Sequence, residues 1–416
     1  MWLRVLIILA VVGLAEYYSY IVVRSALRSL PQVWRTALMV TYILLTVFLW
    51  LSVIFFRQID WAKLPHMARN IYIAFSLGFA IGKVLVLLVM LVDDLRRLVV
   101  WLVSLAMPAK EVAGDTGQVR GMSRSAFFST LALILGGTSL LGFIYGVSNR
   151  YNYRVRRLQL KFPSLPAAFK GLKIVQVSDI HTGSFDNHDA VAKGIQRILD
   201  EKPDVIFFTG DLVNNEADEV DGRYQEIYAR LNAPMGVYSI LGNHDYGDYK
   251  HWPSKEAKKE NLDRLKQMQG GMGWKLLLNE HVVLQRGNDK IAVIGVENWS
   301  AKGFHTYGDM AKAYEGLGEQ EIPFKILLSH DPSHWDAQVR PKYGDVQLTL
   351  SGHTHGMQFG IEIPGFKWSP VQYMYKEWAG LYREGDQHLY VNRGFGFLGY
   401  PGRLGILPEI TVMELV

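Results

Sequence analysis

Hydrophobic positions dominate the first third of this chain and become less frequent after it. Residues 37–56 form a run of 20 without a charged side chain, and residues 126–147 form another run of 22. Each run is long enough to cross the roughly 30 Å hydrocarbon core of a bilayer as an α-helix. Residues 3–23 and 71–92 are almost as apolar and carry only isolated charges. The pattern predicts four membrane-spanning helices.

Two isolated charges lie inside these predicted spans, Glu16 in the first and Lys83 in the third. They can form an ion pair within the bundle, but we prefer the simpler interpretation that Lys83 extends toward the interface and Glu16 lies at the membrane edge. Residues 98–107 are too short to span and should prolong the third helix or lie in the interface. The first span has an alternative as a cleaved signal peptide, which the absence of a clean cleavage pattern around Glu16-Tyr17-Tyr18 disfavours.

The composition becomes mixed near residue 150, so the sequence predicts a transmembrane region over residues 1–150 and a globular domain over residues 151–416. In the second region, apolar runs alternate with helical stretches, beginning with a strand at 173–177 and a helix at 187–201, whose expected N-cap is Asn187. Further strands are predicted at residues 205–209, 237–241, 291–296, 326–328, 346–350, 389–391 and 410–415. This alternation is typical of an α/β fold whose sheets are covered on both sides.

Chemically reactive side chains directly follow five of the predicted strands. Those strands end in Asp179-Ile180-His181, Gly210-Asp211, Gly242-Asn243-His244-Asp245, Ser329-His330-Asp331 and Gly352-His353-Thr354-His355. In sheet-based folds the loops at the carboxyl ends of strands converge on a shared ligand site. The sequence therefore predicts one site that collects carboxylate, amide and imidazole groups.

These ligand types favour two divalent metal ions. Carboxylate oxygen, imidazole nitrogen and amide oxygen suit Mn, Fe or Zn, and the absence of cysteine excludes a thiolate site. Two ions that share a carboxylate lower the pKa of a shared water, so that hydroxide attacks phosphorus in line. Gly210, Gly242 and Gly352 are expected to let the backbone turn beside the metals without a Cβ clash.

The ordered set of Asp-x-His, Gly-Asp, Gly-Asn-His-Asp, His and Gly-His-x-His resembles the calcineurin-like metallophosphoesterase family over about residues 170–416. Within that family the chain is similar to the membrane-associated bacterial group of the YkuE and YaeI phosphoesterases. That similarity is carried by Gly-His-Thr-His-Gly, Trp378-Ala379-Gly380-Leu381-Tyr382, Leu389-Tyr390-Val391-Asn392-Arg393-Gly394 and Pro408-Glu409-Ile410-Thr411. The resemblance implies a four-layer αββα sandwich, preceded here by the α-helical transmembrane bundle.

The resemblance also implies residue roles. Asp179, His181 and His355 would bind the first metal, Asn243, His330 and His353 the second, Asp211 would bridge the two ions, and His244 would act beside them on the phosphoryl group or the leaving oxygen. Two positions depart from the family pattern. Asn214 stands where an aspartate often orients the histidine, and it offers a hydrogen-bond acceptor without a charge. Met357 stands in place of a glycine and is expected to narrow the rim of the pocket.

Residues outside the motifs receive weaker predictions. The histidines expected to be ordinary surface or core residues are His66, His188, His281 and His388. His251, His305 and His334 fall between motifs and are weaker candidates for the substrate mouth. Arg393 either clamps a phosphate or pairs with a carboxylate, and the sequence leaves both interpretations open.

Together these patterns predict a membrane-anchored hydrolase of a phosphomonoester, phosphodiester or pyrophosphate. Its substrate is a phosphorylated small molecule or lipid, and a lipid-linked substrate is favoured because four spans hold the site near the bilayer. Residues 246–252 and the lysines that follow can contact such a lipid, although we expect an ordinary solvated helix there. The alternative is a membrane sensor or assembly protein that binds phosphorylated ligands without turnover, against which the intact His244 argues. A net charge of +5 is too small to indicate a nucleic-acid partner.

Basic residues in the loops between spans bear on topology, because such loops favour the cytoplasm. The residues that place the first and third loops there are Arg24, Arg28, Arg35, Arg96, Arg97, Lys110, Arg120 and Arg124. The opposing residues are Arg57, Lys63 and Arg69 in the second loop and Arg150, Arg154, Arg156 and Arg157 after the fourth span. Residues 123–128 also resemble a twin-arginine export signal that has lost its second arginine. We therefore expect a multi-pass protein of a bacterial inner membrane with an extracytoplasmic catalytic domain.

Overall fold

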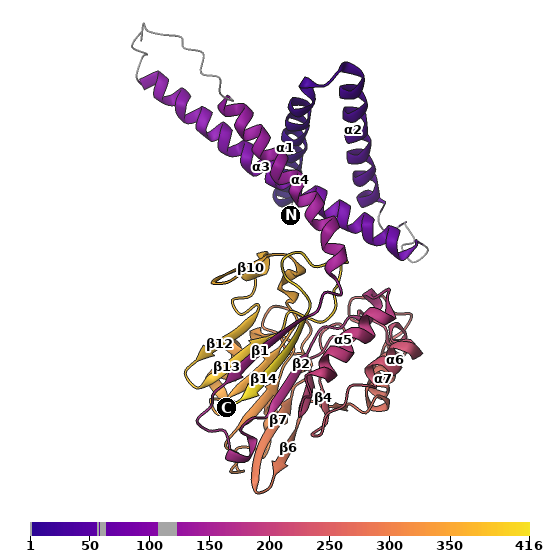
Figure 1. The fold of residues 1–416 in the computed structure, drawn as a ribbon, viewed down its shortest axis with the longest axis vertical. Helices are drawn as coiled ribbons and strands as arrows, with labels where there is room; N and C mark the ends of the chain where they lie inside the picture. The colour runs from indigo at the N-terminus through magenta and orange to yellow at the C-terminus, as the bar shows by residue number, and fades with distance from the viewer. Residues whose placement is uncertain (1, 56–57, 59–63, 107–122) are drawn as a thin grey trace. The chain divides into compact units, whose positions relative to one another are not determined.

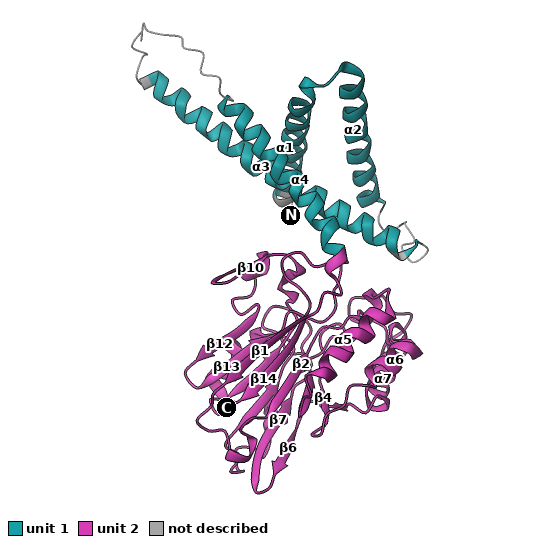
Figure 2. Cartoon of the chain, in the orientation of Figure 1, with its two compact units in different colours: residues 1–147 teal, residues 148–416 magenta. Residues whose placement is uncertain are grey.

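The computed structural model describes residues 2–55, 58, 64–106 and 123–416. The chain forms two compact units, residues 1–147 and residues 148–416, which are coloured separately in Figure 2. The second unit lies wholly within the described residues. Each unit is described below by itself.

The first unit is made of long apolar helices. The helices are α1 (Trp2–Ala26), α2 (Gln32–Ile54), α3 (His66–Ala106) and α4 (Arg124–Gly146), drawn in Figure 1. Within the described residues, these four are long and apolar enough to cross a membrane. The prediction of a multi-pass membrane protein is therefore confirmed.

Helix α3 is much longer than the predicted third span. It runs for 41 residues, so the apolar stretch that begins at residue 98 prolongs the third helix as far as Ala106. Small residues allow α3 to pack closely against α4. A Cβ atom added to Gly82 would lie 2.8 Å from the carbonyl oxygen of Gly136, so side chains larger than hydrogen do not fit at this crossing.

The preferred interpretation of the two intramembrane charges is wrong. The ammonium of Lys83 lies 2.7 and 2.6 Å from the two carboxylate oxygens of Glu16, and it also donates to the hydroxyl of Thr46 at 3.2 Å. The indole of Trp50 donates to the same carboxylate at 2.9 Å. In a medium without water these partners satisfy groups that would otherwise be costly to bury, and they link α1, α2 and α3.

The second unit contains two mixed β-sheets and a small hairpin (Figure 1). The first sheet has the order β1-β14-β2-β3-β4-β5, with strands Arg154–Leu160, Glu409–Leu415, Lys173–Val177, Val205–Phe208, Val237–Ser239 and Lys275–Leu276. The second has the order β12-β13-β9-β8-β7-β6, with strands Gly380–Glu384, Gln387–Val391, Leu348–Ser351, Lys325–Leu328, Asp289–Gly295 and Glu280–Arg286. The hairpin pairs β10 (Ile361–Ile363) with β11 (Phe366–Trp368). Every predicted strand is present.

Helices cover the outer faces of the two sheets. They are α5 (His188–Asp200), α6 (Gly222–Tyr228) and α7 (Lys255–Gly271) beside the first sheet, and α8 (Met310–Tyr314) and α9 (Arg340–Lys342) beside the second. As predicted, Asn187 caps α5, its side chain accepting the amide of Ala190 at 3.0 Å. The four-layer αββα sandwich is confirmed.

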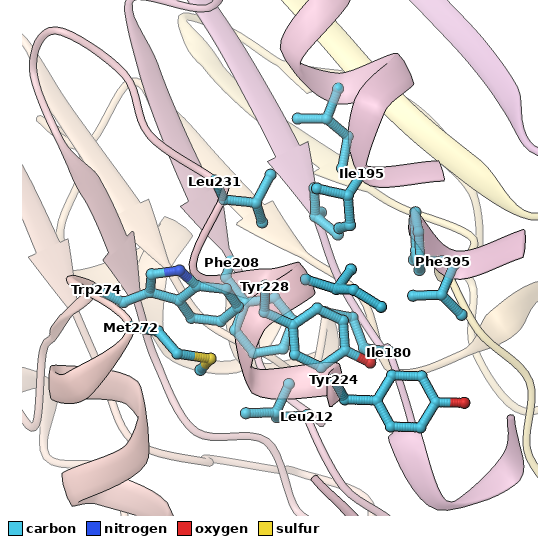
Figure 3. Close-up of a cluster of buried hydrophobic side chains, with 14 of the residues drawn as sticks. Ile180, Ile195, Phe208, Leu212, Tyr224, Tyr228, Leu231, Met272, Trp274 and Phe395 are labelled. Atoms are coloured by element: carbon cyan, nitrogen blue, oxygen red, sulfur yellow. The ribbon is translucent and has the colours of Figure 1, made fainter. Parts of the chain in front are cut away.

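Alternating side chains build the core of this sandwich because successive residues of a strand point to opposite faces. Phe207 on β3 packs between the sheets with Ile326 and Leu328 of β8, whereas the neighbouring Phe208 faces the helical layer. Figure 3 shows that helical layer, where Phe208 lies among Tyr228 and Trp274. Both faces of the central strands are therefore buried, and only the loops at the strand ends are left to carry chemistry.

Candidate metal centre

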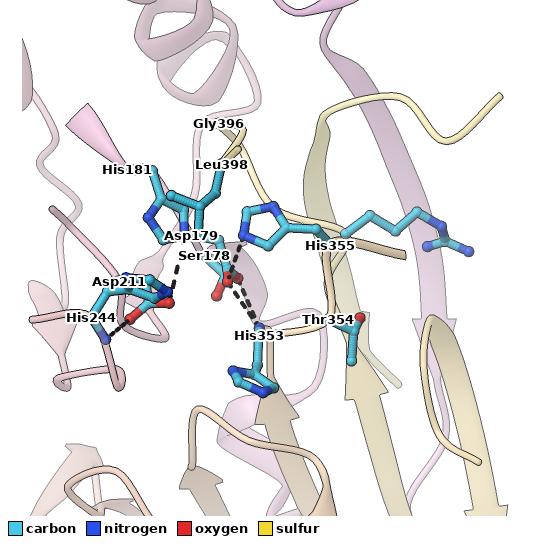
Figure 4. A network of polar contacts seen from close by, with 12 residues as sticks. Ser178, Asp179, His181, Asp211, His244, His353, Thr354, His355, Gly396 and Leu398 are labelled. Atoms are coloured by element: carbon cyan, nitrogen blue, oxygen red, sulfur yellow. Dashed lines mark hydrogen bonds and ion pairs between the residues drawn. The ribbon is translucent and has the colours of Figure 1, made fainter. Parts of the chain in front are cut away.

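The candidate metal centre lies where the carboxyl ends of five strands meet. Strands β2, β3 and β4 of the first sheet run parallel, as do β8 and β9 of the second, so their carboxyl ends lie at the same edge. Two groups of ligand atoms converge there, each within 4.8 Å of one another: Asp179, His181 and His355 in one, and Asp211, His330 and His353 in the other. Figure 4 shows Asp179, His181, Asp211 and His355 gathered around a common centre. The predicted residues are therefore brought together.

The backbone at this centre adopts the left-handed conformation that L-residues rarely use. The φ angles are 53° at Asp179, 50° at His181, 61° at Asp211, 70° at His353 and 50° at His355. Each such residue costs on the order of 1 kcal/mol or more, and such costs collect at functional sites. The surrounding sheets hold the strained loops in place and turn the side chains inward.

The predicted role of the glycines is confirmed at two close approaches. A Cβ atom on Gly352 would lie 1.9 Å from the hydroxyl oxygen of Ser178 and 2.1 Å from a carboxylate oxygen of Asp179. A Cβ atom on Gly242 would lie 2.2 Å from a carboxylate oxygen of Asp211. Neither position accommodates any other residue without displacing a ligand carboxylate.

Three imidazole nitrogens in the centre are buried without a hydrogen-bond partner among the described residues: Nε2 of His181, His330 and His355. The Nδ1 atom of His330 donates to the carbonyl oxygen of Thr209 at 2.7 Å, which leaves Nε2 as a lone-pair donor. In the same way Nδ1 of His181 lies 3.1 Å from Oδ1 of Asn214. Each of the three Nε2 atoms lies 3.1 to 3.5 Å from a carboxylate oxygen of Asp211 or Asp179. Buried imidazole nitrogens that converge on carboxylates without a hydrogen bond fit divalent cations, which use such atoms as ligands.

His353 presents the opposite nitrogen. Its Nε2 lies 2.8 Å from the hydroxyl of Tyr375, and its Nδ1 lies 2.8 Å from Oδ1 of Asn243. The amide nitrogen of Asn243 donates to the hydroxyl of Tyr249 at 2.8 Å, so the amide oxygen is the atom that faces the centre. The imidazole nitrogen of His353 and the amide oxygen of Asn243 point at the same place. A cation bound there would be a better partner for both atoms than either atom is for the other.

The centre holds ionised carboxylates, which a cation site needs. Burial opposes ionisation of Asp211, but the imidazoles of His330 and His244 hold the pKa of that carboxyl well below its usual range. Burial works against the charged form of His330 too, but Asp211 and Asp179 raise the pKa of His330 to about 10. The same carboxylate field that retains this proton would retain a metal ion in its place.

His244 lies beside the two ligand groups and belongs to neither. Its backbone amide donates to Oδ1 of Asp211 at 2.9 Å, and its Nδ1 donates to the backbone carbonyl of Asn214 at 2.8 Å. The predicted residue thus orients His244, but through its main chain, while the side chain of Asn214 serves His181. Since Nδ1 is engaged, Nε2 of His244 is the atom available for substrate.

A cavity of about 270 Å³ lies over the centre. Its polar lining includes His181, Asp211, Asn243, His244, His353 and His355, and its apolar lining includes Phe304, Met357, Val371, Met374 and Leu398. Met357 is 51% exposed and has a φ of 54°. It lies on the rim of this cavity, at the position where a glycine was expected.

Several other predicted candidates lie away from the cavity. Arg393 is buried and pairs with Glu409 at 2.6 Å and Glu362 at 2.7 Å, so it has the carboxylate partners of the second interpretation. His334 is buried among Ser329, Gln338 and the stacked Trp299. His251 and His305 are exposed and do not line the cavity.

The ordinary histidines have local partners. His188 lies 2.9 Å from Asp221, Nδ1 of His281 lies 2.9 Å from the carbonyl oxygen of Ala313, and the ring of His388 makes an edge-to-face contact with Phe162. The side chain of His66 lies outside the described side chains.

Sequence reasoning missed three residues that support the ligands. Asp245 accepts backbone amides of Asp211 at 2.9 Å and of Gly242 at 2.9 Å, and thereby fixes the loop that carries the predicted bridging ligand. Tyr375 contacts His353 and donates to Asp331 at 3.2 Å. Asp245 and Asp331 stood inside the motifs and could have been found there, whereas nothing in the sequence points to Tyr375.

Comparison with known proteins gives two family matches. The profile of the "Calcineurin-like phosphoesterase" family matches residues 172–357, and that of "Probable Calcineurin-like phosphoesterase, transmembrane domain" matches residues 3–150. The chain is 32% identical to the uncharacterized metallophosphoesterase YkuE of Bacillus subtilis over 259 residues, which cover 62% of this chain and 83% of YkuE.

Two further relatives carry more specific names. The phosphodiesterase YaeI of Escherichia coli is 26% identical over 298 residues, which cover 71% of this chain and all of YaeI. The UDP-2,3-diacylglucosamine pyrophosphatase LpxG of Chlamydia trachomatis is 29% identical over 310 residues, which cover 63% of this chain and 88% of LpxG. Both align with most or all of their length.

Proposed function

The chain belongs to the calcineurin-like metallophosphoesterase family, and from this premise we propose that it is a membrane-anchored hydrolase that uses two divalent ions, Mn, Fe or Zn, to cleave a phosphomonoester, phosphodiester or pyrophosphate. The observation that carries the proposal is that Nε2 of His181, His330 and His355, none of which has a hydrogen bond within the described residues, lies 3.1 to 3.5 Å from the carboxylates of Asp211 and Asp179.

In this proposal the ligands divide between two positions. Asp179, His181 and His355 hold one ion, Asn243, His330 and His353 hold the other, and Asp211 lies between them. When bound, the ions supply Lewis acidity and an activated water for attack on phosphorus. Asp245 keeps Asp211 in its strained conformation through backbone hydrogen bonds. The loop is thereby organised before substrate arrives.

His244 is the residue that we assign to the substrate rather than to a metal. Its Nδ1 is held by the carbonyl oxygen of Asn214, and its ring lines the cavity. From there Nε2 can donate a proton to the leaving oxygen or a hydrogen bond to the phosphoryl group. This arrangement favours hydrolysis over the alternative of a sensor that binds phosphorylated ligands without turnover.

A lipid-linked phosphate is the substrate class that we favour. Four apolar helices anchor the chain in a membrane, and the relative LpxG is named for a diacylated pyrophosphate substrate. The cavity rim also combines apolar residues such as Met357 and Met374 with a polar floor. A phosphate with an attached acyl group would match that division.

The test is to purify the full chain in detergent, remove metal with a chelator and reload it with Mn, Fe or Zn. Each form is assayed against phosphomonoesters, phosphodiesters and lipid pyrophosphates. We expect activity to be lost on removal, to return with at least one of these metals, and to be highest on a lipid substrate. Full activity after complete metal removal would refute the metal-dependent mechanism, and activity confined to soluble esters would refute the lipid assignment.

We further propose that the catalytic domain faces the extracytoplasmic side of a bacterial inner membrane. The support is the basic character of the first and third loops, although Arg57, Lys63, Lys110 and Arg120 lie outside the described residues. Protease added to intact spheroplasts should then remove the domain after Tyr151. Protection of the domain until the membrane is lysed would place it in the cytoplasm.

A further inference from the structure

The β10–β11 hairpin turns its charged face toward the domain and its apolar face outward, which is the reverse of an ordinary surface hairpin. Its strands pair Ile361 with Trp368, Glu362 with Lys367 and Ile363 with Phe366, around a turn at Pro364-Gly365 in which Gly365 has a φ of 80°. Because side chains alternate along a strand, the two charged residues share one face and the four apolar residues share the other.

The charged face of the hairpin is fastened to the body of the domain. Glu362 accepts hydrogen bonds from the guanidinium groups of Arg156 at 2.6 Å and Arg393 at 2.7 Å. Lys367 donates to the carbonyl oxygen of Ala379 and to the hydroxyl of Tyr382 at 3.1 Å. These bonds fix which face of the hairpin is turned inward.

The apolar face is turned outward. Ile361 is 49% exposed, Ile363 58% and Phe366 53%, and the adjacent Tyr373 and Met374 are 77% and 59% exposed. Within residues 148–416, all of which are described, six of the ten exposed large hydrophobic residues fall between positions 357 and 374. Such clustering marks an interaction site, since single exposed apolar residues are otherwise scattered over a surface. We call Ile361, Ile363, Phe366, Tyr373 and Met374 the apolar rim.

The apolar rim adjoins two other features of the domain. Met374 lines the cavity over the metal centre, as does Met357 just before the hairpin. Arg156, which bonds to Glu362, lies in β1, the first strand after the last membrane helix. Only residues 147–153 separate α4 from β1, and they span at most about 25 Å when fully extended. The strand that leaves the membrane and the hairpin are thus bonded to each other.

We propose that the apolar rim inserts into the interfacial layer of the bilayer in which the chain is anchored, and that it holds the mouth of the cavity at the lipid surface. A bilayer is the occupant that these observations favour, because the short connection keeps the domain beside one and because Trp368 and Tyr373 have the amphipathic rings that settle at lipid headgroups. The evidence for docking is the geometry of the hairpin. The inference that this surface receives lipid-linked substrates rests on the proposed function.

The absence of cysteine gives a direct test of docking. In the full chain, Ile363→Cys is spin-labelled after reconstitution into vesicles of equal parts phosphatidylcholine and phosphatidylglycerol. Asn288→Cys, at the exposed turn of the β6–β7 hairpin, is the matched control. We expect the label at position 363 to collide readily with dissolved oxygen and poorly with a water-soluble nickel complex, and the control label to do the reverse.

Equal access of nickel to both labels would overturn the proposal. So would spin–spin broadening at position 363 that disappears on dilution with unlabelled protein, because the rim would then contact a second copy of the chain. This readout does not depend on activity, so it tests docking even if the proposed substrate class is wrong.

A second test separates docking from catalysis. Ile363→Asp with Phe366→Asp is compared with Val283→Asp, a substitution of an exposed apolar residue on β6. Hydrolysis of a lipid pyrophosphate in vesicles should fall by about ten-fold or more in the rim variant. The reason is that two apolar side chains are no longer transferred from water into the bilayer when the domain docks. Hydrolysis of bis(p-nitrophenyl) phosphate and the melting temperature should match the control. An unchanged rate on the vesicle substrate would refute a role for the rim.

Discussion

The two units of this protein both bury charged side chains. They differ in whether those charged groups have all the hydrogen-bond partners that they need. In the membrane unit the ammonium of Lys83 has three acceptors, the two oxygens of Glu16 and the hydroxyl of Thr46. Trp50 donates to Glu16 as well. No further ligand is needed to satisfy this ion pair, and its helices keep regular backbone geometry.

In the catalytic unit the buried charges are left incomplete. Three imidazole nitrogens have no hydrogen bond among the described residues and lie 3.1 to 3.5 Å from carboxylate oxygens, and five of the candidate ligand residues adopt left-handed backbone conformations. Strained backbone conformations of this kind collect at functional sites. The comparison teaches that burial of charge does not by itself identify a functional site, whereas ligand atoms that converge from several strained loops do indicate one. The difference is testable, because neutralising a member of the Glu16–Lys83 pair should leave hydrolysis intact, whereas neutralising a carboxylate of the candidate metal centre should not.

The largest effect is expected from Asp211→Asn. Asp211 lies within 3.5 Å of His181 and 3.1 Å of His330, between the two ligand groups. A neutral amide bridges two cations poorly, so turnover should be abolished and both metals should bind more weakly. Metal analysis of the purified variant checks this, with Asp200→Asn at the exposed end of α5 as the control. Near-normal turnover with a full metal content would show that Asp211 does not bridge.

A smaller loss is expected from His244→Ala. The variant should keep its metals, because His244 belongs to neither ligand group, but should hydrolyse esters with poor leaving groups about 10² to 10⁴-fold more slowly. Esters with activated leaving groups need less protonation and should be affected less. The matched control is His251→Ala, which removes an exposed histidine. Equal losses on both kinds of ester would exclude leaving-group protonation and retain only charge stabilisation.

The ligand residues could be predicted because each follows an apolar strand directly, and parallel strands place such ends together. The four long helices were equally accessible from uncharged runs. In both cases the signal is local in sequence. The strands that were not predicted include β1, β5 and the β10–β11 hairpin. Strands β1 and β5 pair with strands far away along the chain, and the strands of the hairpin are only three residues long.

The finer chemistry of the site could not be predicted, because it depends on remote partners. Whether Nδ1 or Nε2 of His353 faces the centre is decided by Tyr375, and the orientation of His244 by a backbone carbonyl. The pairing of Glu16 with Lys83 likewise depends on how three helices pack. The sequence shows which side chains are present, but which of their atoms face the site depends on partners from remote parts of the chain.

Asn214→Ala should have a moderate effect that separates the two functions of this residue. Its side chain holds His181, so metal affinity should fall by about 10- to 100-fold, the usual cost of losing a partner of a metal-binding histidine. Its carbonyl oxygen, which orients His244, is retained in alanine. With saturating metal, the dependence of rate on leaving group should therefore equal that of the parent and of the control Asn215→Ala. A changed dependence would mean that the side chain, not the main chain, positions His244.

The smallest effect is expected in the membrane unit. Glu16→Gln leaves Lys83 without its anionic partner, and should lower the stability of the helical unit by about 1 to 2 kcal/mol, the range found for polar contacts between membrane helices. Adding Lys83→Met removes the charge that was left unpaired, so the double variant should recover part of the loss. Thermal unfolding in detergent, followed by tryptophan fluorescence, measures both changes.

Metal content and hydrolysis of a soluble ester should stay at the parent level in both membrane variants, because the ion pair is closed within its own unit. The matched control is Thr46→Val, which removes only the weakest of the three acceptors of Lys83, at 3.2 Å, and should destabilise least. A double variant less stable than either single variant would show that the pair holds the helices together by more than mutual neutralisation. Loss of metal from the catalytic unit in Glu16→Gln would contradict the comparison, since the Glu16–Lys83 pair would then affect the metal ligands of the other unit.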